Sequence, residues 1–185
     1  MINVCFAGIT GWTAPPIAAA IAAADDLALV SGVSRSAAGN FSVMAAVLGR
    51  AAAMAAQHLD HWEILDYASD DKPDVPSGTS RELAETLAGV RTPQAAVPLA
   101  DLHGPAEARG AEVAGTRIHS MRLPSFVVTT EIVFGGPGER LVLRHDPGLT
   151  PDPYVAGTLL AVRNVADTVG VRRGLDSLLF PDDQG

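Results

Sequence analysis

The chain has 185 residues, 48% of them apolar, which suits one ordinary domain or two small ones with a packed core. A net charge of −8 and scattered arginines exclude a phosphate-backbone footprint, so nucleic acid is not expected as a partner. No apolar run reaches the ~20 residues of a transmembrane helix and no basic leader precedes the first strand, so we expect a cytoplasmic protein without membrane contact.

The first predicted elements are a strand, a helix and a second strand. Residues 2–7 are a short apolar run, and residues 14–24 form an alanine-rich helix with Thr13 as N-cap and two prolines in its first turn. Residues 27–33 form the next strand, and this β-α-β order predicts a right-handed parallel unit. Cys5, the only cysteine, belongs to the core, and five dispersed histidines predict no metal site.

The rest of the chain predicts a helix, a strand and a helix, and then mainly strands. A long helix over 41–59 is followed by a strand over 61–67, a polar loop and a helix that Gly89 closes. Thr79 and Glu82 fit a capping box at the start of that helix. Beyond an irregular connection over 90–113, we expect strands over 116–123, 125–134 and 140–146, the last two joined by a hairpin, and a final helix over 153–170.

The turn after the first strand is a candidate phosphate-binding turn. Gly8, Gly11 and Ala14 form a GxxGxxA pattern, whose small residues would let a pyrophosphate approach a helix N-terminus. An ordinary glycine-rich turn explains the pattern equally well. The end of the second strand favours the nucleotide, because Ser34 and Arg35 stand where a ribose 2′-phosphate would lie, and they indicate NADPH rather than NADH.

The stretch KPDVPSGT, residues 72–79, holds the only lysine among thirteen basic residues. Ser77, Gly78 and Thr79 stand at the mouth of a helix, where hydroxyls and amides can hold a carboxylate or a phosphate. Plain helix capping explains Thr79, but it does not explain Lys72. Lysine is a compact donor that gives up a proton when its pKa is lowered, so we favour a chemical role for this ammonium.

The glycine turn, AGNFSV (38–43), WEILDY, KPDVPSGT and residues 117–146 together resemble dihydrodipicolinate reductase, an NAD(P)H-dependent enzyme of lysine and diaminopimelate biosynthesis. The resemblance covers nearly the whole chain, and KPDVPSGT is its most specific part. It implies that Lys72 is the general acid and that Ser77, Gly78 and Thr79 hold a substrate carboxylate. It also implies a set of cofactor contacts, with the last two near the nicotinamide and the domain hinge: Gly8, Thr10, Gly11, Trp12, Ser34, Arg35, Asn40 and Phe41.

The chain departs from the family in two places. The family has a histidine pair shortly before the lysine, whereas residues 67–71 here read YASDD. The family's nucleotide domain also continues after its second strand, and on the order of three βα units are absent between Arg35 and Asn40. This loss is natural, engineered or due to an omitted stretch.

The predicted fold is α/β. A partial Rossmann-type domain over residues 1–39, completed by the C-terminal helix within 150–185, accompanies an α+β domain with a mixed sheet over 40–149. The expected function is reduction of a small cyclic imino dicarboxylate by NADPH, with NADH as the alternative cofactor. The competing hypothesis is a non-catalytic or cofactor-free module that binds small acids. Either protein is expected to form a homotetramer, or at least a homodimer, through strands 116–146, whose alternating pattern leaves one apolar face uncovered.

Overall fold

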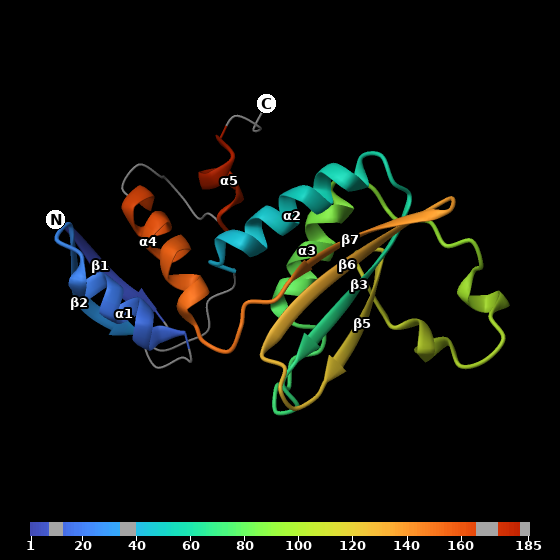
Figure 1. Ribbon diagram of the computed structural model, residues 1–185, viewed down its shortest axis with the longest axis horizontal. Helices are drawn as coiled ribbons and strands as arrows, with labels where there is room; N and C mark the ends of the chain where they lie inside the picture. Colours follow the sequence, from blue (N-terminus) through green and yellow to red (C-terminus); the bar gives the residue numbers. More distant parts are fainter. Residues whose placement is uncertain (8–12, 34–39, 166–173, 182–185) are drawn as a thin grey trace. The chain divides into compact units, whose positions relative to one another are not determined.

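The structure, a computed structural model, describes residues 1–7, 13–33, 40–165 and 174–181 (Figure 1). The chain divides into two compact units, of which one comprises Met1–Val47 and Leu149–Gly185 and the other comprises Leu48–Gly148. In the described residues, the strands of the first unit form a two-stranded sheet and those of the second form a five-stranded sheet. None of the helices in these ranges has the length and apolar character that a bilayer span requires.

The predicted β-α-β unit is confirmed in the first unit. Strands β1 (Ile2–Ala7) and β2 (Leu27–Val33) pair in parallel, and α1 (Ala14–Ala23) connects them. Thr13 is the N-cap of α1, as predicted, but its side chain makes no capping hydrogen bond. Cys5 of β1 is exposed, so the prediction that it belongs to the core is wrong. The pairing runs to the last residues of both strands, so the segments that follow Ala7 and Val33 start from neighbouring strand ends.

The C-terminal part of the chain completes the core of the first unit. It contains the short 3₁₀ turn η3 (Asp152–Tyr154), α4 (Val155–Asn164) and α5 (Asp176–Leu179). The predicted helix over 153–170 therefore begins with a 3₁₀ turn, and its last residues lie outside the described ranges. Residues of α4 pack on the buried cluster of Val4, Ile17, Ile21 and Leu27.

Gly157 of α4 lies close to the backbone of another segment of the first unit. A Cβ atom at this position would lie 2.0 Å from the carbonyl oxygen of Phe41 and 2.5 Å from Leu175 Cδ1. The absence of a side chain at position 157 therefore allows the helix to touch the segment that precedes α2 (Val43–Ala56).

The five-stranded sheet of the second unit is mixed, with the order β4-β5-β3-β6-β7. Strands β3 and β5 pair in parallel, and the other pairs are antiparallel. The predicted strand over 125–134 instead spans 128–136, because Ser125 has a φ of 73° and because both glycines at its end still pair with β7. The strands are β3 (His61–Ala68), β4 (Ala111–Val113), β5 (Thr116–Arg122), β6 (Val128–Gly136) and β7 (Glu139–His145).

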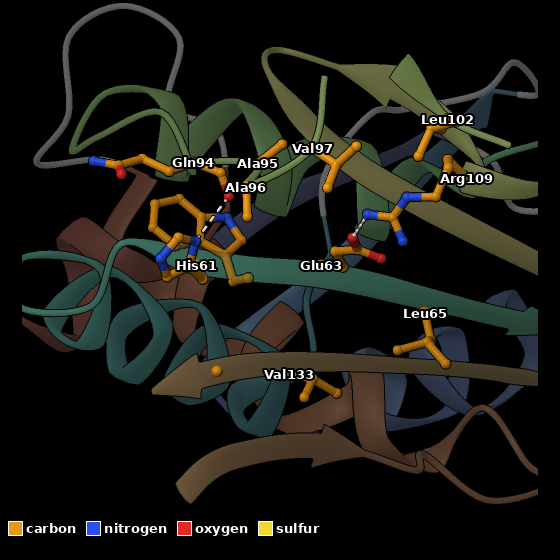
Figure 2. A pocket seen from close by; sticks show the side chains of 12 residues that line it. His61, Glu63, Leu65, Gln94, Ala95, Ala96, Val97, Leu102, Arg109 and Val133 are labelled. Carbon is orange, nitrogen blue, oxygen red and sulfur yellow. Dashed lines mark hydrogen bonds and ion pairs between the residues drawn. The ribbon is translucent and has the colours of Figure 1, made fainter. Parts of the chain in front are cut away.

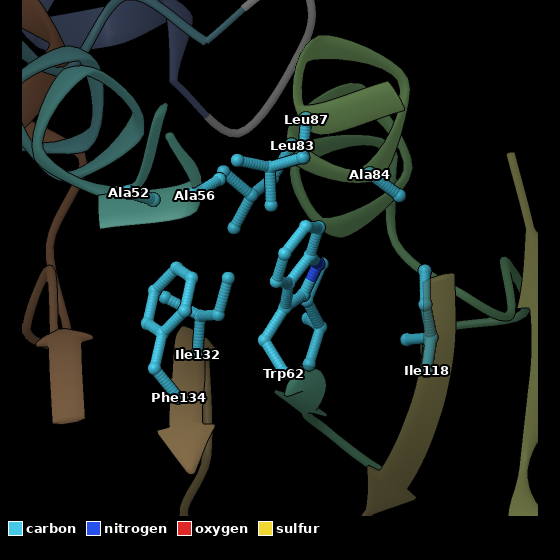
Figure 3. Packing of buried hydrophobic residues seen from close by; sticks show 10 residues of the cluster. Ala52, Ala56, Trp62, Leu83, Ala84, Leu87, Ile118, Ile132 and Phe134 are labelled. Atoms are coloured by element: carbon cyan, nitrogen blue, oxygen red, sulfur yellow. The ribbon is translucent and has the colours of Figure 1, made fainter. Parts of the chain in front are cut away.

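Helices α2 and α3 (Gly78–Ala88) cover one face of this sheet. Ala52 and Ala56 of α2 and Leu83, Ala84 and Leu87 of α3 face the strands in Figure 3. The centre of the covered face is a row of three paired isoleucines, Ile118, Ile64 and Ile132, each at most 2% exposed, which we call the isoleucine row. These side chains are withdrawn from water and form the core that stabilises the second unit.

The next row on the same face is polar. Two positions along the strands from each isoleucine stand Ser120, Asp66 and Thr130, paired across β5, β3 and β6. Because side chains alternate along a strand, these residues point to the helices as the isoleucines do. Asp66 is fully buried and Thr130 is 2% exposed. This polar row lies where the chain leaves β3 and enters α3.

Candidate active site

Lys72 lies in the connection between β3 and α3. The Lys72 amide donates a hydrogen bond to the Ser69 carbonyl oxygen (3.2 Å), and this bond forms a turn just after the end of β3. Lys72 Nζ is 2.8 Å from Asp74 Oδ1, and the two side chains are 29% and 44% exposed. Partial burial would raise the pKa of Asp74, but the hydrogen bond and charge of Lys72 outweigh it and lower that pKa. The predicted general acid is thus accessible and already paired with a carboxylate.

The N-cap of α3 is Ser77, two residues before the predicted one. Ser77 has extended backbone angles, and its hydroxyl accepts a hydrogen bond from the Ser80 amide at 3.4 Å. The prediction that Thr79 and Glu82 form the capping box is therefore wrong. The reason is a contact distant in sequence: the Ser77 amide donates to Asp66 Oδ2 (2.9 Å), which fixes the chain just before the helix.

Asp66 joins the strand to this loop and to the helix. Its carboxylate accepts hydrogen bonds from the Ser77 amide, from Ser80 Oγ (3.2 Å) and from Ser120 Oγ (2.9 Å). It also forms an ion pair with Arg122 at 2.8 Å. Burial would raise the pKa of Asp66, but the hydrogen bonds from Ser77, Arg122 and Ser120 outweigh burial and hold that pKa below its usual range. Asp66 is therefore a buried, ionised group.

Arg122, at the end of β5, reaches the same loop. One guanidinium nitrogen, Nη2, lies 2.8 Å from Asp66 Oδ2 and 2.6 Å from the carbonyl oxygen of Asp74. The other, Nη1, donates to the carbonyl oxygens of Asp66 and Met121. Arg122 therefore contacts the residue whose side chain pairs with Lys72.

Gly78 begins α3 with an open approach to its backbone. A Cβ atom built on Gly78 would meet nothing within 4 Å, so the surrounding protein does not require a glycine here. Gly78 is exposed and Thr79 is half-buried, at the end of a helix whose first amides favour an anion. An ammonium and a helix N-terminus on one short, anchored loop are suited to a small ligand that carries carboxylates.

The predicted cofactor residues fall mostly outside the described ranges. Gly8, Thr10, Gly11, Trp12, Ser34 and Arg35 all lie in the segments 8–12 and 34–39, so their predicted contacts stay predictions. Of the two described residues, Asn40 accepts a hydrogen bond from the Ser42 amide at its Oδ1 (2.8 Å), and Phe41 presents its carbonyl to Gly157. Both residues help to fix the chain just before α2.

A hollow of about 610 Å³ lies on the open face of the five-stranded sheet. The connection between α3 and β4, with its short turns η1 (Leu99–Asp101) and η2 (Ala106–Arg109), forms one wall (Figure 2). In that view Arg109 pairs with Glu63, and His61 Nδ1 lies 2.9 Å from the Gln94 carbonyl oxygen. Its one acidic lining side chain is thus already paired, and Lys72 and Ser77 are not among its lining residues.

Sequence reasoning missed Asp66, Ser80, Ser120 and Arg122. A signal for Asp66 was available in the strand HWEILDYA, where alternation puts Asp66 on the same face as Trp62 and Ile64. A carboxylate at a core-facing position needs partners, because an unpaired buried charge is expensive. Nothing in the local pattern identified those partners, since Ser120 and Arg122 follow more than 50 residues later.

In the described residues, no three His, Cys, Asp or Glu side chains are grouped so that they could hold a metal ion.

The stretch that stands in place of the family's histidine pair begins inside β3. Tyr67 is 8% exposed and stacks on Phe126 with ring centroids 5.3 Å apart, and Ala68 is fully buried. Both residues serve the packing of the strand.

Comparison with protein families gives a match over residues 41–179 to the C-terminal part of dihydrodipicolinate reductase. A 4-hydroxy-tetrahydrodipicolinate reductase from Carboxydothermus hydrogenoformans is 40% identical over 141 residues, which are 76% of this chain and 53% of the relative. The enzyme of the same name from Synechococcus elongatus is 41% identical over 143 residues, or 76% and 51% of the two chains. The chain thus spans about half the length of these curated relatives.

One solved structure shares the fold. It is described as a dipicolinate-bound dihydrodipicolinate reductase from Paenisporosarcina sp. TG-14, and it aligns with a TM-score of 0.78 over 96% of this chain and 99% of that one. The sequence identity is 20%, so the likeness concerns the fold. The predicted fold class, α/β with a mixed sheet, is confirmed.

Proposed function

The chain belongs to the dihydrodipicolinate reductase family, and we propose that it reduces a small cyclic imino dicarboxylate with NADPH. The proposal extends to this chain the activity in the names of relatives of which it covers about half. When bound, the nicotinamide would supply a hydride, and the protein would supply binding groups and a proton. In this role the protein would work in the cytoplasm, on a substrate of lysine and diaminopimelate biosynthesis.

Lys72 would deliver the proton. As hydride adds to one atom of the substrate's C=C or C=N bond, the ammonium gives its proton to the other atom and becomes a neutral amine. A lysine suits this step because its ammonium can give up a proton, whereas a guanidinium keeps its proton. The ion pair with Asp74 would have to open when the substrate arrives, and a substrate carboxylate can take the place of the Asp74 carboxylate.

The N-terminus of α3 would hold a carboxylate of the substrate. The observation that carries the proposal is that Lys72 and this helix end belong to one loop, which Asp66 and Arg122 anchor. Gly78 leaves room for a ligand against the backbone, and the Thr79 hydroxyl is half-buried at the same end. Two positive features on one loop match two carboxylates on one small ring.

NADPH would bind at the ends of β1 and β2. Ala7 and Val33 are paired neighbours at the ends of two parallel strands. The turn with Gly8 and Gly11 follows the first strand, and the stretch with Arg35 follows the second. That arrangement fits a dinucleotide at strand ends, with Arg35 near the 2′-phosphate. A two-stranded sheet buries little of such a ligand, so the affinity should be weak. Arg35→Asp should move the preference toward NADH, and equal affinity for both cofactors before and after the change would remove Arg35 from the site.

Two titrations of the purified chain test the proposal. Isothermal calorimetry with dipicolinate, the ligand named for the solved relative, should show binding that Thr79→Val weakens, and NADPH should quench Trp12 or Trp62 fluorescence. NADPH oxidation in the presence of substrate then reports turnover. Binding of dipicolinate without NADPH binding or turnover would favour the second hypothesis, a module that binds small acids. That hypothesis has one observation in its support, the small sheet of the first unit.

We also propose that the protein forms a homotetramer, or at least a homodimer, through the open face of the five-stranded sheet. No α-helix of the second unit covers this face in the described residues, and the connection between α3 and β4 lies over only one part of it. Val142 and Met121 on this face are 45% and 39% exposed. Charged pairs such as Glu131 with Arg144 surround these apolar side chains. An apolar patch with a polar rim is typical of a surface for self-association. Light scattering that shows a monomer at micromolar concentration would overturn this assignment.

A further inference from the structure

The polar row of the five-stranded sheet contains a charged group, the Asp66 carboxylate, which pairs with Arg122 although packing of the core does not require an ion pair. Asp66 is completely buried between two rows of a packed face, with Ile64 before it and Ala68 after it on the same side of β3. Replacement of a buried ion pair by apolar residues of similar volume is often neutral or stabilising. Stability of the fold therefore gives no reason for a carboxylate and a guanidinium at this position, and the groups that they contact indicate another reason.

Asp66 and Arg122 hold the loop between β3 and α3, which contains Lys72, at two points. Asp66 accepts a hydrogen bond from the Ser77 amide, at the end of the loop. Arg122 donates to the carbonyl oxygen of Asp74, in the middle of the loop, at 2.6 Å. Each of these contacts is made to the backbone, so it fixes the course of the chain rather than one side-chain rotamer. Between the two points only Val75 and Pro76 remain, and they have little freedom left.

The pair also reaches the groups that would meet the ligand. Asp74, whose backbone Arg122 holds, pairs through its side chain with Lys72 at 2.8 Å. Ser77, whose amide Asp66 holds, caps α3 and so sets where the first amides of the helix point. Asp66 fixes this helix end a second time, because Ser80 Oγ donates to Asp66 Oδ1. One buried ion pair is thus connected both to the ammonium and to the helix N-terminus.

We propose that Asp66 and Arg122 form a clamp that sets the distance between Lys72 and the N-terminus of α3, and so determines how well the loop fits a dicarboxylate. Both are positioning residues, since they act through Asp74 and Ser77. The inference rests on the proposed function in one respect, the dicarboxylate as ligand. A rigid loop raises affinity because less freedom is lost on binding. Arg122 Nε, buried with no hydrogen-bond partner in the described residues, indicates that the guanidinium is oriented for its Nη contacts.

Asp66→Asn is the main test. Asparagine keeps the shape, but it has no charge to pair with Arg122 and one acceptor oxygen in place of two, so it cannot accept at both positions where Asp66 accepts hydrogen bonds. The dipicolinate affinity, measured by calorimetry, should fall at least tenfold. Leu87→Ala is the matched control, because Leu87 is fully buried in the same helix, at the end far from the loop. It should lower the unfolding midpoint comparably and change the affinity less than twofold. Equal losses of affinity in both variants would overturn the clamp.

A second measurement does not depend on the ligand. Hydrogen exchange of the Ser77 amide in the free protein should be at least tenfold faster in Asp66→Asn than in the wild type, while Leu87→Ala should not single out this amide. If the wild type does not bind dipicolinate, the proposed function fails, and this exchange rate still decides the clamp. Unchanged exchange at Ser77 would overturn the clamp even if dipicolinate binds.

Milder changes keep the test valid if Asp66→Asn does not fold. Ser120→Ala removes one hydrogen bond to Asp66, and Arg122→Lys keeps the charge but cannot reach Asp66 and Asp74 with one planar group. Both should weaken dipicolinate binding, and Arg122→Lys should weaken it more than Ser120→Ala, because it breaks the hold on the Asp74 backbone as well. The opposite order, or unchanged binding in both variants, would contradict the role assigned to the pair.

Discussion

The isoleucine row and the polar row are neighbours on one face of one sheet, yet they have opposite chemistry. Ile118, Ile64 and Ile132 bury hydrocarbon that needs no specific partner. Two positions away, each polar side chain must find a defined partner, and Asp66 finds four. The first row explains why the helices stay on the sheet, whereas the second explains the course of the loop that follows β3. A buried face can therefore serve stability in one row and geometry in the next.

The largest effect should come from the loop that the polar row holds. Lys72→Ala should lower turnover by about 10²–10⁴-fold, the usual contribution of a general acid. Folding should be unaffected, because Lys72 is partly exposed and its pair with Asp74 is a surface pair worth ~1 kcal/mol at most. NADPH oxidation and thermal unfolding measure the two quantities. Lys72→Arg should lose turnover to a similar extent, because a guanidinium keeps its proton. Turnover of Lys72→Ala at a rate close to that of the wild type would contradict the mechanism.

Ile64→Ala, in the isoleucine row, should show the reverse pattern. Ile64 is fully buried, so its truncation should lower the free energy of unfolding by about 2–5 kcal/mol. Denaturant unfolding measures this loss, and Val90→Ala, at a site that is 38% exposed, should stay within about 0.5 kcal/mol. An unchanged free energy of unfolding in Ile64→Ala would contradict the stabilising role assigned to the isoleucine row.

Of the two rows, only the polar row should respond to acid. The folded state holds the pKa of Asp66 below its unfolded value near 3.8, so the stability that this carboxylate contributes is present above that pH. It is lost as the pH falls through the lower, folded pKa. At neutral pH Asp66→Asn should cost about 3 kcal/mol, because it breaks a buried pair. The gap between wild type and variant should narrow below about pH 4 in urea unfolding. A constant gap would show that Asp66 is not ionised.

The smallest effects separate capping from binding at the end of α3. Ser77→Ala removes the N-cap hydroxyl and should cost about 1 kcal/mol of stability. Thr79→Val should cost only a few tenths, since Thr79 is not the cap, and should instead weaken dipicolinate binding about tenfold. Thermal unfolding and calorimetry on both variants measure the contrast. A larger stability loss in Thr79→Val than in Ser77→Ala would restore the cap predicted from sequence.

Local patterns were sufficient to predict most of the strands. The run over 27–33 is a strand over the same residues, and the parallel β-α-β order follows from two apolar runs and one helix between them. The boundaries failed where a distant contact decides. The N-cap of α3 is Ser77 rather than Thr79, because Asp66, eleven residues earlier, holds the Ser77 amide. The short strand over 111–113 and the 3₁₀ turns η1 and η2 lie in a stretch with no periodicity, which was expected to be irregular.

Half of the candidate site could be predicted and half could not. Lys72, Ser77, Gly78 and Thr79 are adjacent in sequence, so their spacing alone indicated a loop suited to a carboxylate. The groups that anchor this loop come from two strands and a helix, and their spacing in the sequence does not show that they meet. Only the parity of Asp66 within its strand indicated that a buried charge needed a partner.

The order of the five-stranded sheet has a consequence for how the protein is made. β3 lies at its centre, but both of its neighbours, β5 and β6, are synthesised later, from residue 116 and residue 128 onward. While the ribosome adds some fifty residues, the middle strand emerges with two unsatisfied edges. Distant pairing of this kind slows folding and leaves backbone open to other chains. A growing chain interrupted between residues 69 and 115 should therefore depend on chaperones far more than one that ends after β7.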